Sequence, residues 1–228
     1  KRFVHDDNDP HSLSHNVVMD VLEDSVGNLW ISTYGDGLNK FTPQTGIFEK
    51  IDLTLGVNDQ FQTESLYQLA LASDGILWVC STTGLKWVDT NSSAVMPLPQ
   101  ILQTMPKKTI SEVIFDSQQR AWMGSYYDGV FLYDPKHPAD LQQFEHNPDE
   151  VNTLGVNKVR TLGEDEHGTI WVGTANSLNR FTPFKDSDKK PEQGKGSDKL
   201  SGFFTPFASS DHPEMDDLAL SGITAGSM

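Results

Sequence analysis

The segment from His5 to Ser12, "HDDNDPHS", is rich in carboxylate and amide oxygens. Calcium takes such hard oxygen ligands in proteins, but the segment lacks the glycine and the distal glutamate of an EF-hand loop. A second segment, "HNPDEVNT" from His146, keeps the histidine and shifts the acids. A turn built from Asp, Asn and Pro accounts for both segments better than a metal site does, so we assign no metal ligand.

Other side chains with catalytic potential occur singly. Cys80 is the only cysteine and lies in the apolar run "LWVCS", where a free cysteine commonly acts as a small buried hydrophobe. No two histidines have zinc spacing. The sequence also lacks a phosphate loop, a dinucleotide fingerprint and a nucleophile elbow. We therefore expect no cofactor and no catalytic residue, and we predict that the chain is not an enzyme.

A recurring tryptophan organises the sequence. Trp30, Trp78, Trp122 and Trp171 follow one another at steps of 48, 44 and 49 residues. The first and last lie in near copies, "EDSVGNLWISTYGDGLNKFTP" and "EDEHGTIWVGTANSLNRFTP". The match continues backward, where "FVHDDNDPHSLSHN" aligns without a gap on "FEHNPDEVNTLGVN". A period of this length is that of a propeller blade.

Each repeat contains four short strand-like runs separated by turns rich in Gly, Asp and Asn. No window shows a convincing helical period, so few helices are expected. We predict an all-β fold: a β-propeller piece of about four four-stranded antiparallel blades, either a fragment of a larger propeller or self-assembling into one. The expected blades cover residues 17–53, 66–98, 110–145 and 157–208. Residues 1–5 are expected as the outer strand of a preceding blade, 185–199 as a flexible loop and 216–228 as the start of a further blade.

An open arc of four blades would expose apolar faces at both ends, which soluble proteins avoid. We therefore expect a homodimer, for example an eight-bladed ring, with tight closure of four blades as the alternative. The four recurring tryptophans are interpreted as the structural blade core. Stacking of these rings on sugars is the less favoured alternative.

The stretch "SLSHNVVMDVLEDSVGNLWISTYGDGLNKFTPQTGIF" resembles the two-component regulator propeller repeat. The shared pattern includes Ser-Leu-Ser, Glu-Asp-x-x-Gly-x-Leu-Trp and Gly-Leu-Asn-Lys-Phe. It is close in the first and fourth copies and looser in the other two. The resemblance implies a periplasmic sensor propeller, of about seven blades, in a bacterial receptor. It also implies a β-sandwich, a membrane helix and a histidine kinase or GGDEF-type diguanylate cyclase further along the chain.

Function in such a fold is expected where the repeats differ. The loop between the second and third strands of each blade shares a face of the ring with the loop that enters the inner strand. The candidate ligand-binding residues there are Tyr34, Asp36, Tyr126, Tyr127, Asp128 and Asn176. Aromatic faces with acidic acceptors suit an oligosaccharide or a peptide. Ordinary exposed turns are the alternative interpretation.

The net charge limits the classes of binding partner that are expected. With 17 Lys and Arg against 32 Asp and Glu, the net charge is −15. Such a surface repels phosphate backbones and anionic lipid, so neither nucleic acid nor direct membrane contact is expected. No run of 18 apolar residues occurs either.

We hypothesise an extracytoplasmic, periplasmic sensory segment of a signal-transduction receptor. The first alternative is a scaffold propeller for protein contacts or dimerisation. The second is a sialidase-like glycoside hydrolase, because the acidic turn before each tryptophan is similar to the Asp-box hairpin. No cluster of basic residues for a carboxylate substrate is present, although paired carboxylates brought together by different blades stay possible.

Replacing Trp30 or Trp171 by alanine is expected to lower the free energy of unfolding by about 3–5 kcal/mol, because a large core ring is lost. Urea unfolding measures this loss. A change within about 0.5 kcal/mol, as is usual for surface substitutions, would contradict a core role.

Overall fold

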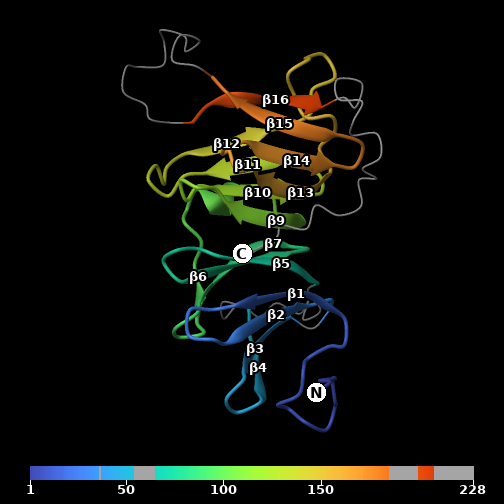
Figure 1. Ribbon diagram of the computed structural model, residues 1–228, viewed down its shortest axis with the longest axis vertical. Helices are drawn as coiled ribbons and strands as arrows, with labels where there is room; N and C mark the ends of the chain where they lie inside the picture. The colour runs from blue at the N-terminus through green and yellow to red at the C-terminus, as the bar shows by residue number, and fades with distance from the viewer. Residues whose placement is uncertain (36, 54–64, 185–199, 208–228) are drawn as a thin grey trace.

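The computed structural model describes residues 1–35, 37–53, 65–184 and 200–207. Within these ranges the chain forms β-strands and one short 3-10 helix, and the strands group into four four-stranded antiparallel sheets. Figure 1 shows the sheets following one another along the long axis of the molecule, in chain order. The all-β prediction is therefore confirmed. Asp36, the expected loop 185–199 and the expected blade start at 216–228 lie outside the described residues.

Each sheet is an up-and-down meander of consecutive strands, which we call blades 1 to 4. Blade 1 contains β1 (Val18–Glu23), β2 (Leu29–Thr33), β3 (Leu38–Thr42) and β4 (Ile47–Ile51). Blade 2 contains β5 (Leu66–Leu71), β6 (Ile76–Ser81), β7 (Gly84–Asp89) and β8 (Val95–Met96). Blade 3 contains β9 (Ile110–Phe115), β10 (Ala121–Ser125), β11 (Val130–Tyr133) and β12 (Leu141–Phe144), preceded by the helix η1 (Leu102–Thr104). Blade 4 contains β13 (Val159–Glu164), β14 (Ile170–Thr174), β15 (Leu178–Pro183) and β16 (Gly202–Phe207).

Residues 1–5 were expected as an outer strand, and the structure places them in no strand. A strand requires a neighbour to pair with, and the segment instead packs through its side chains. The ring of Phe3 lies 5.0 Å from that of Phe41 and 5.3 Å from that of Phe48. The segment therefore covers part of blade 1 without extending its sheet.

An aspartate six residues before the tryptophan shapes the turn between the first two strands. In blade 1, one carboxylate oxygen of Asp24 accepts the backbone N–H groups of Val26 and Asn28. The other accepts the indole N–H of Trp30 at 2.9 Å. The same indole bond recurs between Asp116 and Trp122 at 2.9 Å, and between Asp165 and Trp171 at 2.8 Å. Blade 2 has Ala72 at this position.

Each of the first three tryptophans packs against the following blade. Trp30 shares a buried cluster with Leu66 and Leu69 of blade 2. The equivalent clusters join Trp78 to Ile110 and Val113 of blade 3, and Trp122 to Val159 and Leu162 of blade 4. Trp30 and Trp122 are fully buried, whereas Trp171 is partly exposed. The cost of removing Trp171 is therefore expected to be smaller than that of removing Trp30.

A second contact, which we call the inner-strand clamp, joins the first strands of successive blades. Each clamp residue lies at or beside a register shift in the pairing of the first two strands of its blade, and a bulge of this kind re-aims a side chain. Its side-chain oxygen accepts a backbone N–H of the next blade. The bonds run from Leu69 to Asp20 at 2.8 Å, from Val113 to Gln68 at 2.9 Å and from Leu162 to Glu112 at 2.6 Å.

The clamp at Glu112 yields a matched pair of substitutions. Burial raises the pKa of Glu112, opposed by hydrogen bonds from Leu162 and Thr161, and the charge of Asp20 adds to the rise. Glu112→Gln keeps an acceptor, as Gln68 does in blade 2, and removes a buried charge. Its free energy of unfolding should equal or exceed that of the parent, and increasingly so as the pH rises above the ordinary glutamate pKa.

Glu112→Ala should lose about 1–3 kcal/mol, because the Leu162 N–H is left without this acceptor. Urea unfolding of both variants at several pH values measures the difference. If Glu112→Gln and Glu112→Ala lower the free energy of unfolding equally, the clamp hydrogen bond contributes nothing to stability.

A further prediction concerns the loss of stability at acidic pH. The hydrogen bond from the Trp171 indole, followed by bonds from the turn, lowers the pKa of Asp165 to about 2. This lowered folded-state pKa contributes stability that is present above the ordinary aspartate pKa near 3.8 and is lost as the pH falls toward about 2. The difference in thermal midpoint between the parent and Asp165→Asn should therefore shrink across that window. Asp149→Asn, at an exposed turn position, is the control, and an equal pH effect there would contradict the assignment.

Candidate ligand-binding rim

The loops between the second and third strands lie at one end of every blade, beside the entry to the inner strand. Backbone hydrogen bonds tie the two segments together in each blade. They run from Tyr34 to Val17, from Thr82 to Ser65, from Tyr126 to Thr109 and from Ala175 to Lys158, with lengths of 2.9 to 3.1 Å. The four loops therefore define a common rim, in which the sequence-predicted site residues that the structure describes lie.

Four tyrosines from three successive blades gather on this rim, and we call them the tyrosine rim: Tyr34, Tyr67, Tyr126 and Tyr127. The ring of Tyr126 lies 6.2 Å from that of Tyr67 and 6.3 Å from that of Tyr127. Tyr34 and Tyr127 are exposed to solvent. Burial raises the pKa of Tyr67, with further contributions from Tyr126, Tyr34 and Tyr127. The four phenols therefore share one electrostatic neighbourhood, and the Tyr67 phenol stays neutral at physiological pH.

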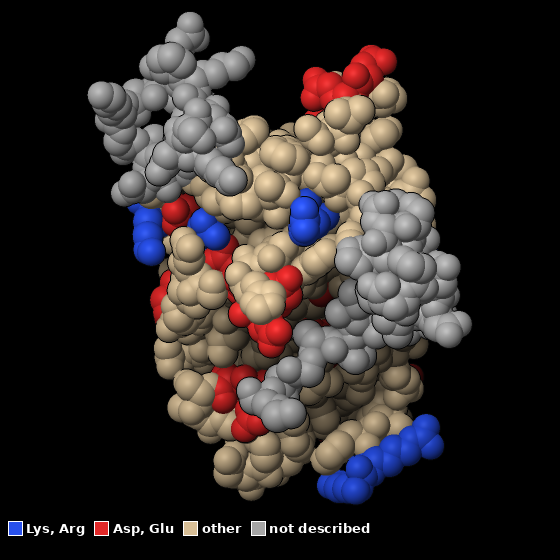
Figure 2. All heavy atoms as spheres, turned by 45° about the horizontal axis from the view of Figure 1, so that its top comes forward, with Lys and Arg blue, Asp and Glu red and all other residues tan. Residues whose placement is uncertain are grey.

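Two lysines lie over these rings. The ammonium of Lys158 is 4.9 Å from the ring centre of Tyr126, and that of Lys108 is 6.0 Å from Tyr127. Lys108 also pairs with Asp128 at 2.9 Å. On the face drawn in Figure 2, acidic side chains form several patches and basic side chains appear at a few separate places. The rim thus combines aromatic faces, hydroxyls, one carboxylate and two cations in an acidic protein.

The structure does not unite all the residues that the sequence predicted. Tyr34, Tyr126, Tyr127 and Asp128 belong to the rim described above. Asn176 is exposed, and its side-chain oxygen accepts hydrogen bonds from Thr174 and Ser177 within its own turn. Asp36 lies outside the described residues. The predicted site residues that the structure brings together are therefore those of blades 1 and 3.

Three rim residues were missed from the sequence: Tyr67, Lys108 and Lys158. Tyr67 lies in β5, inside the strand and not in a loop. The lysines precede β9 and β13, at the entry to the inner strands. That entry is expected from the sequence to share the rim with the loops, so position within the repeat was the signal that could have found the two lysines.

The remaining chemical candidates have structural roles. His5 and His146 each hydrogen bond through Nδ1 to a backbone carbonyl, of Leu13 at 2.7 Å and Leu154 at 2.6 Å. Asp6 and Asp9 accept N–H groups of their own turn. Over the described ranges, no group of three or more His, Cys, Asp or Glu is arranged to hold a metal ion. Burial, and then the charges of Glu112 and Asp20, raise the pKa of Cys80 well above its usual value, so its thiol stays neutral.

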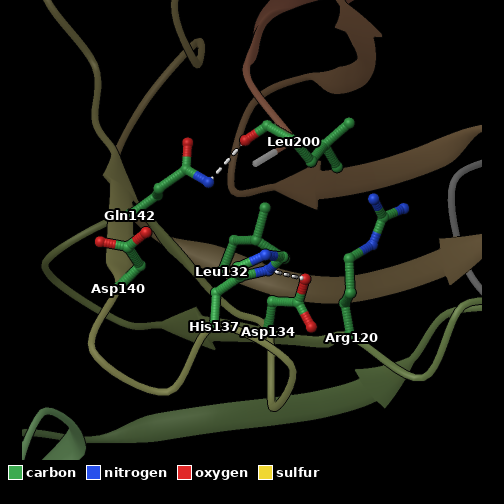
Figure 3. Close-up of a pocket in the computed structure, with 7 residues that line it drawn as sticks. All are labelled: Arg120, Leu132, Asp134, His137, Asp140, Gln142 and Leu200. Atoms are coloured by element: carbon green, nitrogen blue, oxygen red, sulfur yellow. Dashed lines mark hydrogen bonds and ion pairs between the residues drawn. The ribbon is translucent and has the colours of Figure 1, made fainter. Parts of the chain in front are cut away.

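A small pocket lies at the outer edge of blade 3, where it meets Leu200 (Figure 3). Its polar groups already have partners. His137 pairs with Asp134 at 2.9 Å, and the Gln142 amide donates to the Leu200 carbonyl at 2.6 Å. Arg120 binds Asp116 at 2.6 Å. The residues that line the pocket therefore join blades 3 and 4, and the tyrosine rim is the better candidate for a ligand site.

Consecutive meander sheets joined by packed tryptophans define β-propeller blades, and solved structures share this arrangement. The extracellular domain assigned to the hybrid two-component system BT4673 of B. thetaiotaomicron matches with a TM-score of 0.62 and 20% identity, over 76% of this chain and 23% of that one. PorZ of Porphyromonas gingivalis, a surface component of the type-IX secretion system, matches with a TM-score of 0.56 and 16% identity, over 89% of this chain and 28% of that one. At these identities the likeness shows the fold alone.

The sequence comparisons are more specific. Residues 12–35 and 153–176 match the family model of the two component regulator propeller, so the chain carries repeats of this type in blades 1 and 4. A histidine kinase, P4, of Formosa agariphila is 27% identical over 175 residues, which are 73% of this chain and 12% of that protein. The chain therefore spans about an eighth of the length of this relative. No helix in the described ranges has the length and apolar character that a membrane crossing requires.

Proposed function

We propose that this chain is the extracytoplasmic sensory part of a bacterial signal-transduction receptor and recognises its ligand at the tyrosine rim without catalysis. Its propeller repeats and its similarity to a histidine kinase support a receptor. The output of such a receptor is a histidine kinase or a diguanylate cyclase, and the sensory part lies in the periplasm. The single observation that carries the ligand site is the convergence of four tyrosines from three blades.

The chemistry of the rim suits an oligosaccharide or a peptide. Phenol rings offer flat apolar faces for stacking, and their hydroxyls donate and accept hydrogen bonds. Asp128 is held in place by Lys108 and by the Ser125 hydroxyl. A fixed carboxylate is an acceptor for hydroxyl or amide groups, and it costs little ordering when a ligand binds.

Ligand binding at the tyrosine rim would affect how the blades pack against one another. Tyr34 follows β2 of blade 1, Tyr67 lies in β5 of blade 2 and Tyr126 follows β10 of blade 3. A ligand that spans them contacts three blades at once. It therefore favours one relative position of those blades over another, which is the differential affinity that a signal requires.

A scaffold that serves only protein contacts is the second candidate function. Exposed apolar residues on β1, including Val18 and Val21, favour it. A ligand screen separates the two candidates, because a pure scaffold binds neither an oligosaccharide nor a short peptide at the rim.

Calorimetric titration with panels of oligosaccharides and peptides should identify a binder. Tyr127→Ala and Tyr34→Ala should each weaken that binder by at least tenfold, or about 1.4 kcal/mol, because an exposed stacking face is lost. Both positions are exposed, so folding should be retained, as circular dichroism can verify.

Phe184→Ala removes an exposed ring from blade 4 and serves as the control, with binding unchanged. Affinity that survives both tyrosine substitutions would place the ligand elsewhere. Turnover of chromogenic glycosides by the purified chain would contradict the non-catalytic assignment.

A further inference from the structure

Lys158 departs from the repeat at the entry to an inner strand. Its backbone carbonyl accepts the N–H of Ala175, and the residues that make the equivalent bond in blades 1 to 3 are uncharged: Val17, Ser65 and Thr109. The backbone bond itself requires no charged side chain. Because function in a repeat fold is expected where the repeats differ, the cation of blade 4 is a candidate for a role beyond the fold.

The side chain of Lys158 is oriented, yet its hydrogen-bond donors are unused. Its ammonium lies 4.9 Å from the ring centre of Tyr126 in the preceding blade, and this cation–π contact orients the chain. An ammonium has three N–H donors. Lys158 is exposed, and among the described residues its ammonium donates no hydrogen bond and pairs with no carboxylate. A cation held in this way is pre-organised for an anion that arrives from solvent.

The second lysine of the rim, Lys108, has a different role. Its ammonium pairs with Asp128 at 2.9 Å, and the same carboxylate accepts the Ser125 hydroxyl at 3.3 Å. The charge of Lys108 is therefore balanced within its own blade, and the pair holds the carboxylate in place. Of the two lysines over the tyrosine rings, Lys158 is the one whose charge no described residue balances.

An exposed aromatic face lies next to this cation. Tyr127 is 63% exposed, and its ring centre is 6.3 Å from that of Tyr126. The Lys158 ammonium covers the Tyr126 ring, so Tyr127 presents the more open face for stacking. The rim thus places a stacking surface, a fixed carboxylate and an unbalanced cation side by side on blades 3 and 4.

These three groups together select one class among the ligands that suit the rim. A neutral saccharide would stack on Tyr127 and donate hydroxyls to Asp128, but it would leave the Lys158 ammonium to water. A strongly acidic peptide would satisfy Lys158, but each further carboxylate would be repelled by a protein with a net charge of −15. A sugar ring that carries a single oxyanion satisfies all three groups at once.

We propose that the tyrosine rim recognises an acidic saccharide, with a carboxylate or sulfate group on Lys158 and a sugar ring on Tyr127. The inference rests on the proposed sensory function and names the ligand class of the same site. Carboxylate and sulfate both supply the oxyanion that a charge-assisted hydrogen bond from an ammonium requires. Asp128 accepts hydroxyls of the same ligand, and Lys108 keeps that carboxylate in position.

The test compares each acidic saccharide with its neutral counterpart by calorimetric titration of the 228-residue chain. The probes are short oligosaccharides of galacturonic acid and their methyl esters, and sulfated galactose oligosaccharides and their desulfated forms. At least one acidic probe should bind roughly tenfold more tightly than its neutral counterpart, because it alone gains a hydrogen bond to a charged donor. The pair that shows this preference identifies the oxyanion as carboxylate or sulfate.

Three variants assign the preference to the rim. Lys158→Gln should give the acidic and neutral probes equal affinities, with binding of the neutral probe unchanged. Asp128→Asn removes the charge that balances Lys108 and should increase the preference for the acidic probe. Lys136→Gln makes the same charge change at an exposed turn of blade 3 outside the rim, and it should leave the preference unchanged. Because the measured quantity is a ratio of two affinities, a partial loss of folded protein does not alter it.

The outcomes separate this inference from the proposed function. Neutral probes that bind as tightly as acidic ones, or a preference that survives Lys158→Gln, would overturn the ligand class and leave a sensory rim in place. Binding of tetraglutamate in place of every saccharide would overturn it as well. A panel in which no probe binds, or binding that is insensitive to Tyr127→Ala, would contradict ligand recognition at the rim altogether.

Discussion

The structure depends on one contact: an indole ring from each of the first three blades lies against the sheet that follows it. Trp30 and Trp122 are fully buried in this way, and each joins apolar residues of two sheets into one cluster. A ring of this size supplies several kcal/mol at about 25 cal/mol per Å² of buried apolar surface. The aspartate that accepts the indole N–H satisfies the one polar group that burial would otherwise isolate, and it also closes the preceding turn.

This contact explains why much of the fold could be predicted from the sequence. An indole between sheets must recur once per blade, so the spacing from Trp30 to Trp171 revealed the blades, and glycine and acidic turns marked the strand ends. The clamp could not be predicted, because Asp20, Gln68 and Glu112 are different residue types placed by bulges. Residues 1–5 were expected to form the outer strand of a preceding blade and lie in no strand, because a strand needs a partner beside it and the residues alone do not disclose one.

The candidate site was predicted only in part, for a related reason. The loop tyrosines Tyr34, Tyr126 and Tyr127 stood out because they break the repeat. Tyr67 did not, because it occupies a strand that otherwise fits the pattern. A rim formed by several blades is a property of their packing, so its full membership follows from the geometry of the junctions. Core and rim are accordingly linked, since the contacts that stack the blades also set the distances among the phenols.

The inner-strand clamp and the indole contact run in the same direction, from each blade to its successor. A growing polypeptide emerges from the ribosome with its amino-terminal end first, so every blade leaves the exit tunnel before the sheet that completes its contacts has been made. The nascent chain therefore lags in folding by about one repeat throughout translation. The most recently synthesised blade holds an indole that stays uncovered until the next sheet forms.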